Sequence, residues 1–270
     1  MSATGMVSTY AGGPTMEGYT DGVLAQARFN RPSALARDSA GNLYVLDMMG
    51  TPLGQSSRQQ DIHAGLVVRR ISPDGVVSTL RGGTLNAPVR AGHLALDAAG
   101  NVYVSVLAHR LNGSNGGITG MMYTADAAYV LKISPQGVAQ VLAGSSAPGS
   151  LGAVDGVGAS ARFRTPAGLA IDNQGRVLVA DEDNYAVRRI TPAGAVSTVV
   201  GMLGNMLVFN ILSNVTWPQK LPSTLWRPEG LTIGPYNRVY LSSGQGSYPW
   251  SETIDPPPVN NTGLFIAEPR

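Results

Sequence analysis

The feature that most limits the fold of this chain is an internal repeat. A short apolar run, a polar turn and a second apolar run recur four times along the sequence. The polar turn ends at Asn42, Asn101, Arg176 and Arg238, so the copies are spaced by 59, 75 and 62 residues. Self-similarity of this kind predicts one supersecondary unit that is repeated along the chain.

Each copy predicts four strands, which we name a to d in chain order. In the third copy they are expected over 168–171, 177–180, 187–190 and 196–199. Strands a and b are joined by residues 172–175, where Asp, Asn and Gly suit a tight turn. Strands c and d are joined by Thr-Pro-Ala-Gly at 191–194, with counterparts at 72–75 and 134–137. Four consecutive antiparallel strands describe the blade of a β-propeller.

The sequence therefore predicts an all-β protein, a four-bladed propeller that forms a single domain over residues 1–270. The blades are expected at approximately 28–83, 84–145, 161–201 and 221–270. The last copy has no strand d of its own, whereas residues 5–13 match the strand d at 75–83. Pairing of residues 5–13 with 264–267 would complete this blade, close the ring and remove unpaired strand edges. The alternative is that the chain forms part of a six-bladed propeller.

Three stretches of the third copy carry a resemblance to a known family. They are the Pro-x-Gly-Leu-Ala-Ile-Asp stretch at 166–172, the Ala-Asp-x-x-Asn stretch at 180–184, and the Val-Arg-Arg-Ile-Thr-Pro-x-Gly-x-Val-Ser-Thr stretch at 187–198. The linker at 155–163, which recurs at 21–29, is similar as well. The chain thus resembles the NHL-repeat β-propellers. The resemblance implies the fold and leaves the function open, because members include enzymes, RNA binders and scaffolds.

Composition excludes several kinds of site and partner. The chain has no cysteine, so it holds neither a disulfide nor a thiolate metal site. Its net charge of +2 does not supply the basic field of a nucleic-acid binder, so we expect no nucleic-acid partner. No apolar run is long enough for a transmembrane helix, and residues 1–5 do not read as a signal peptide. We expect a soluble monomer. It is either cytoplasmic, or secreted or periplasmic after removal of a signal peptide. The 17 arginines against 2 lysines favour a bacterial source.

The long connections predict where a ligand binds. Strands b and c are joined by long segments in three copies, at 48–66, 106–128 and 244–262, and the d-to-a connections at 13–30 and 202–226 are also long. Both kinds of connection leave the same face of a propeller, and long loops on a rigid frame commonly carry function. They could instead brace a small ring. We predict a non-enzymatic scaffold that binds a protein or glycan on this face through aromatic and histidine side chains, namely Tyr19, His63, His109, Tyr123, Trp217, Tyr248 and Trp250.

The alternative function places chemistry in the central channel. His93 stands at a strand-a position where the other copies have Ala34, Gly168 and Gly230, and Glu229 begins the last strand a. A channel histidine and a carboxylate could hold a divalent metal ion and make the chain a metal-dependent lyase or hydrolase. The resemblance includes lyases with channel histidines and a metal, but this chain lacks a recurring set of histidines. We therefore expect no cofactor in the leading interpretation.

Two further motifs have structural interpretations. Asp181 and Asn184 are expected to cap the turn between strands b and c, as this pattern does in NHL copies. The arginine pairs at 69–70 and 188–189 occupy the same position in two copies, so we predict that they brace one blade against another.

Overall fold

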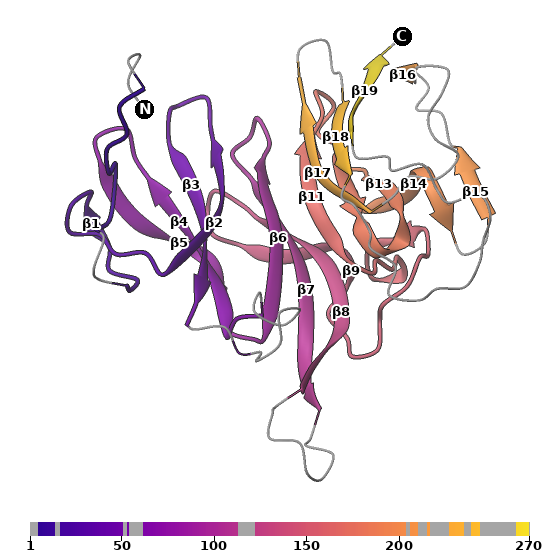
Figure 1. The fold of residues 1–270 in the computed structure, drawn as a ribbon, viewed down its shortest axis with the longest axis horizontal. Helices are drawn as coiled ribbons and strands as arrows, with labels where there is room; N and C mark the ends of the chain where they lie inside the picture. Colours follow the sequence, from indigo (N-terminus) through magenta and orange to yellow (C-terminus); the bar gives the residue numbers. More distant parts are fainter. Residues whose placement is uncertain are drawn as a thin grey trace.

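The computed structural model describes residues 5–13, 17–50, 53, 62–112, 122–203, 206–209, 215–216, 227–234, 239–243 and 263–269. These residues form four antiparallel sheets that follow one another along the chain and lie as an arc in Figure 1. Helical structure in the described ranges is limited to two single turns of 3-10 helix, Gly158–Ser160 and Glu182–Asn184. The all-β fold predicted from the repeat is therefore confirmed. None of these residues forms a helix that could cross a membrane.

Sheets 1 and 2 come from the first two copies of the repeat. Sheet 1 has the order β1-β5-β4-β3-β2, with strands Gly22–Val23 (β1), Arg31–Arg37 (β2), Leu43–Met49 (β3), Gly65–Ile71 (β4) and Val76–Leu85 (β5). Sheet 2 has the order β6-β7-β8-β9, with strands Val89–Leu96 (β6), Val102–Asn112 (β7), Met122–Ile133 (β8) and Ala139–Ser145 (β9).

Sheets 3 and 4 come from the last two copies. Sheet 3 has the order β10-β14-β13-β12-β11, and β15 pairs with β14; its strands are Gly156–Val157 (β10), Pro166–Ile171 (β11), Val177–Asp181 (β12), Ala186–Ile190 (β13), Ala195–Leu203 (β14) and Met206–Phe209 (β15). Sheet 4 has the order β16-β19-β18-β17, with strands Val215–Thr216 (β16), Pro228–Ile233 (β17), Val239–Ser243 (β18) and Gly263–Pro269 (β19).

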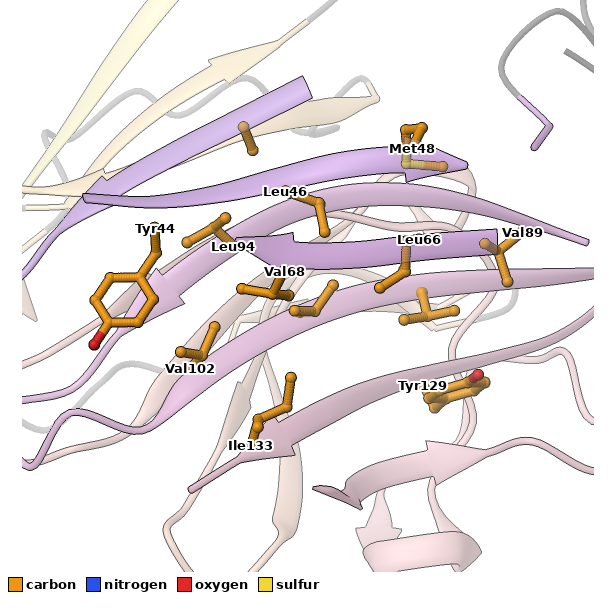
Figure 2. Packing of buried hydrophobic residues seen from close by; sticks show 13 residues of the cluster. Tyr44, Leu46, Met48, Leu66, Val68, Val89, Leu94, Val102, Tyr129 and Ile133 are labelled. Carbon is orange, nitrogen blue, oxygen red and sulfur yellow. The ribbon is translucent and has the colours of Figure 1, made fainter. Parts of the chain in front are cut away.

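Apolar side chains between successive sheets hold the arc together. Leu46 and Val68 of sheet 1 pack with Leu94 and Val102 of sheet 2 in one buried cluster, which Figure 2 shows. A second cluster joins sheets 2 and 3, and a third joins sheets 3 and 4. The inner strands β2, β6, β11 and β17 therefore contact one another in order, each against the next.

The predicted closure of the ring is not formed in this structure. Residues 5–13 form no strand, and the pairing expected between them and residues 264–267 is absent. Instead, the outer edge of β19 pairs with β16, where Val215 lies opposite Pro269 and Thr216 opposite Glu268. In Figure 1 the amino terminus lies beside sheet 1 and the carboxyl terminus beside sheet 4, on opposite sides of the opening in the arc.

Two segments predicted as loops contain strands. The connection expected over 106–128 is an extension of the β7–β8 hairpin, in which Val106 pairs with Tyr129 and Asn112 with Met122. The connection over 202–226 contains β15 and β16.

Arg69 and Arg188 join each sheet to the linker that precedes it. The guanidinium of Arg188 donates to the carbonyl oxygens of Arg162 and Val154 at 2.9 Å each, and it forms ion pairs with Asp155 at 2.7 Å and Asp181 at 3.2 Å. Arg69 makes the equivalent bonds to residues 20, 21 and 28. The prediction that the arginine pairs brace one blade against another is thus wrong. Arg69 and Arg188 hold the linker before their own sheet, and Arg70 and Arg189 bond within their own sheets, to Asn42 and Ser197.

Candidate functional site

The innermost strand of every sheet carries an irregularity at the same repeat position. The register shifts between Pro32 and Ala34 in β2, between Ala91 and Leu94 in β6, between Pro166 and Leu169 in β11, and between Pro228 and Gly230 in β17. A bulge turns neighbouring side chains away from the regular pleat, and bulges are frequent beside functional sites. The repeat therefore places four such irregularities around the place where the inner strands β2, β6, β11 and β17 meet.

The inner strands also approach closely at this point. A Cβ added to Gly92 would lie 2.5 Å from the carbonyl oxygen of Ala167, and one added to Gly168 would lie 2.6 Å from that of Glu229. These distances are too short for any side chain, so glycine is required where one inner strand meets the next. The hydroxyl of Ser105 connects the same strands by donating to the Ala167 carbonyl oxygen at 2.6 Å and accepting from the His93 amide at 2.9 Å.

A cavity of about 460 Å³ lies where the four inner strands meet. It is lined mainly by polar groups, and all four sheets or the turns that follow their strands contribute: Ser33, Met48, His63, Arg90, Gly92, His93, Ala167, Glu182, Glu229, Gly230 and Ser242. Its size falls in the usual range for small-molecule sites, about 300–1,000 Å³. The b-to-c and d-to-a connections leave the sheets at this end, so the cavity lies on the predicted ligand face.

Glu182 links three sheets at the cavity wall. It begins the 3-10 turn after β12, and its side chain is 4% exposed. Arg90 of β6 donates to its carboxylate at 3.3 Å, and Arg227, just before β17, donates to the other carboxylate oxygen. Arg227 also lies 3.7 Å from Asp183. Two guanidinium groups thus face two carboxylates, so the charges on this side of the cavity balance.

His93 and Glu229, the two residues of the alternative channel site, both line the cavity. His93 is open to solvent through the cavity, yet desolvation by the surrounding sheets lowers the pKa of its imidazole below 6.5. The ring is therefore neutral at pH 7 and can accept or donate a hydrogen bond. Glu229 is exposed at the start of β17.

Tyr19 and His63 meet at the end of β3. The amide of Gly50 donates to the Tyr19 hydroxyl at 2.6 Å, and the His63 Nδ1 lies 3.4 Å from the Gly50 carbonyl oxygen. His63 also pairs through its backbone with Val89, which fixes it beside the first residue of β6. His63 lines the cavity, whereas Tyr19 lies behind it, against the loop that follows β3.

His109 and Tyr123 lie together on the outer part of the β7–β8 hairpin rather than in the cavity. His109 is opposite Ala125 and Tyr123 is opposite Leu111. Burial lowers the pKa of the His109 imidazole, whose Nδ1 lies 3.1 Å from the Leu107 carbonyl oxygen. The structure thus divides the predicted face into two groups, and Trp217, Tyr248 and Trp250 lie outside the described residues.

No three His, Asp or Glu side chains of the described ranges are grouped so that they could hold a metal ion. Asp181 has a structural role. It accepts from the amides of Arg164 and Thr165 and from the side chain of Asn184 at 2.6 Å. Asp181 and Asn184 therefore bond to each other across the b-to-c turn, but Asp181 accepts no hydrogen bond from the backbone of that turn, so the predicted cap is not formed.

Arg90, Glu182, Ser33 and Met48 are cavity residues that the sequence analysis did not select. Alignment of the copies contains a usable signal, because Met48 and Glu182 share the repeat position after an aspartate, and Ser33 and Glu229 share one strand-a position. The pairing of Glu182 with Arg90 and Arg227 has no such signal, since the three residues are far apart in the sequence.

Comparison with protein families supports the repeat. The family model described as NHL repeat matches residues 163–190, which cover β11, β12 and β13. A search of curated proteins found no relative of this sequence.

Several solved structures share a distant similarity with the chain. A gluconolactonase from Xanthomonas campestris is 15% identical with a TM-score of 0.48, and the alignment covers 92% of this chain and 60% of that one. A calcium-binding regucalcin from Agrobacterium tumefaciens is 14% identical with a TM-score of 0.43, covering 87% and 59%. An auxiliary nutrient binding protein from Bacteroides thetaiotaomicron is 14% identical with a TM-score of 0.35, covering 86% and 72%.

Proposed function

Starting from a chain whose third copy is an NHL repeat, we propose that the four sheets are blades around the cavity and that the molecule is a binding scaffold. Its ligand is a glycan, which enters from the face that carries the b-to-c and d-to-a connections. The single observation that carries this proposal is the cavity itself, because residues from all four copies line it.

The lining favours a sugar over a flat protein surface. Ser33, His93 and Ser242 offer hydroxyl and imidazole groups, and Arg90 and Glu229 offer charged donors and acceptors. A sugar presents many hydroxyl groups that need such partners, and a buried polar group without a partner costs free energy. A volume of about 460 Å³ suits one or two sugar units better than a protein side-chain cluster.

A glycan array probed with the purified chain tests the proposal. We expect binding to a restricted set of glycans, and at least a ten-fold loss of affinity in His93→Ala and Arg90→Ala. Asp74→Asn is the matched control, because Asp74 lies in a c-to-d turn at the opposite end of sheet 1. If no glycan binds, or if the control loses affinity as much as the cavity variants, the proposal is wrong. If the purified chain binds no glycan but retains a protein in a pull-down, the ligand is a protein rather than a glycan.

The second candidate is a lyase or hydrolase in the same cavity. It is favoured by one observation, the neutral imidazole of His93 in a cavity that Glu229 also lines. A metal would need ligands beyond these two side chains. Metal analysis of the purified protein separates the candidates: a stoichiometric divalent ion that is lost in His93→Ala supports the enzyme, and metal-free protein that binds glycans supports the scaffold.

A further inference from the structure

Sheets 1 and 3 each carry a short strand on their outer edge that sheet 2 lacks. In sheet 1, β1 pairs antiparallel with the start of β5, and in sheet 3, β10 pairs in the same way with the start of β14. Both short strands belong to the linker before the sheet, and both are a Gly-Val pair that follows an aspartate. Only residues 86–88 separate β5 from β6, so β9 itself forms the outer edge of sheet 2 in the described chain.

The outer edge of β9 has backbone groups that no other strand uses. The amide of Ser134 donates to the Val138 carbonyl oxygen at 2.9 Å, so the backbone of Val138 faces β8. Bonded and non-bonded pairs alternate along an antiparallel ladder, so the amide and carbonyl groups of Ala139 and the amide of Val141 point away from β8. No hydrogen bond joins any of these three groups to another part of the described chain.

Side-chain exposure shows that this edge is uncovered. Val77 and Val196, which lie opposite β1 and β10, are 1% and 6% exposed, whereas Ala139 at the same repeat position is exposed. Val141 is 39% exposed. Natural sheets protect their free edges with proline or charged residues, and β9 contains neither. The edge is therefore open to the addition of another strand.

The two paired edges show how an added strand is held. In sheet 3 the Asp155 carboxylate, just before β10, accepts from the Arg188 guanidinium at 2.7 Å and from the Thr198 hydroxyl at 3.0 Å. Asp21 makes the equivalent contacts just before β1 in sheet 1. Each linker strand is thus fixed by a carboxylate in addition to its backbone hydrogen bonds.

Sheet 2 has an apolar pair at the positions of this arginine and threonine. Leu131 pairs with Val141, as Arg188 pairs with Thr198 in sheet 3. Neither apolar side chain can donate a hydrogen bond, so a carboxylate placed here would lose its solvation without gaining an ion pair. An apolar side chain would instead cover Leu131 and Val141 and remove their surface from water.

We infer that the outer edge of β9 is a docking site for an extended segment of a partner protein, which adds to sheet 2 as an antiparallel strand. The segment resembles β1 and β10 but carries an apolar residue where their linkers have aspartate. Hydrogen bonds to the backbone of Ala139 and Val141 supply affinity, and contact with Leu131 supplies specificity.

The position of the added strand is limited at one end. It ends opposite Val138, because Gly82 of sheet 1 already lies against the Gly137 carbonyl group. No described residue of β9 lines the cavity, so this site is distinct from that of the proposed function.

Peptide titration of the full chain, followed by NMR, tests the inference. The probe is Ala-Val-Leu-Gly-Val-Gly, which is the sequence of residues 153–158 with leucine in place of Asp155, and the comparison peptide keeps the aspartate. We expect the probe to shift the amide resonances of Ala139 and Val141, and the comparison peptide to bind at least ten-fold more weakly. Absence of binding by the probe, or equal binding of the two peptides, would overturn the inference.

A matched pair of variants tests the edge itself. Ala139→Pro removes an outward amide and is compatible with an edge strand, so it should weaken binding of the probe at least ten-fold. Ala139→Val is the control and should bind like the parent chain, because Val77 and Val196 occupy this position in sheets 1 and 3. Equal affinity in the two variants would contradict docking on this edge. Dimers of the chain that are lost in Ala139→Pro would also contradict it, since a second copy would then cover the edge.

An exchange of specificity provides a test that does not depend on proline. Leu131→Arg/Val141→Thr restores the side chains that hold Asp21 and Asp155, so this variant should bind the aspartate peptide at least ten-fold more tightly than the probe. An unchanged preference would show that these two side chains do not select the segment. These titrations contain no glycan, so their failure is distinguishable from failure of the proposed function.

Discussion

At the scale of single residues, Arg69 and Arg188 are unusual because a guanidinium is rarely buried completely. Both side chains are 0% exposed, and each stacks on an aromatic ring, Phe29 at 5.1 Å and Phe163 at 5.2 Å. A buried charge is tolerated when it is paired and hydrogen bonded. Its removal leaves the partner charges buried without a counter-charge. These arginines therefore specify the position of each linker.

Replacement of Arg188 should strongly destabilise the fold. In Arg188→Met the carboxylate of Asp181 loses its cation inside the protein, and the expected loss is about 3–5 kcal/mol in the free energy of unfolding. Arg189→Ala is the control. Arg189 is the next residue along β13, it is only half-buried, and its side chain donates a hydrogen bond to Ser197 within the same sheet. Urea unfolding measures both. A loss below about 1 kcal/mol in Arg188→Met would show that the ion pairs do not hold the linker.

At the scale of elements, the a-to-b turn of sheet 2 depends on an ionised carboxylate. The amide and side chain of Asn101 donate to Asp97 at 2.9 and 2.7 Å, and the Tyr103 hydroxyl donates at 2.9 Å. Burial alone would raise the pKa of Asp97, but these hydrogen bonds hold it below the ordinary value of 3.8. The same arrangement recurs at Asp38 with Asn42 and Tyr44.

Acid should therefore weaken this turn. A carboxyl whose pKa is lower in the folded state stabilises the fold above pH 3.8, and that contribution is lost as the pH falls through the folded value. We expect Asp97→Asn to be less stable than the parent chain by about 1.5–3 kcal/mol at pH 7. The gap should shrink between pH 4 and pH 2. Thermal melts of both proteins over this range check it, and a gap that stays constant would contradict the assignment.

The turns and strands of the four copies could be predicted from the sequence because they depend on local chemistry. Asp, Asn and Gly fix the a-to-b turns, and the glycine at 75, 137 and 194 adopts the positive φ that the c-to-d turn needs. The cavity could be predicted only in part. His93 and Glu229 stood out against smaller residues in the other copies, whereas the Glu182 contacts arise from packing between sheets, which has no local signal. The hairpin over 102–133 was missed because no repeated motif marks its outer part.

At the scale of the whole molecule, the interfaces between sheets should carry the stability of the arc. Leu94 of β6 is 3% exposed in the cluster between sheets 1 and 2, whereas its counterpart Leu35 on β2 is 68% exposed. Leu94→Asp should unfold the chain, because it buries an unpaired carboxylate. Leu35→Asp is the control and should leave the fold intact, because the side chain faces solvent. Thermal melts of both variants check this, and an equal loss of stability in the two would contradict it.

The contacts of Glu182 make the cavity mouth tolerant of ions in the surrounding solution. Arg90 and Arg227 reach this carboxylate from two neighbouring sheets, and the carboxylate is 4% exposed. Dissolved salt screens exposed charges that lie more than about 10 Å apart at 0.1 M, but it weakens a contact with a buried partner much less. Higher ionic strength should thus leave both the entrance and the body of the arc intact, so that a ligand would enter and leave at similar rates in brine and in dilute buffer.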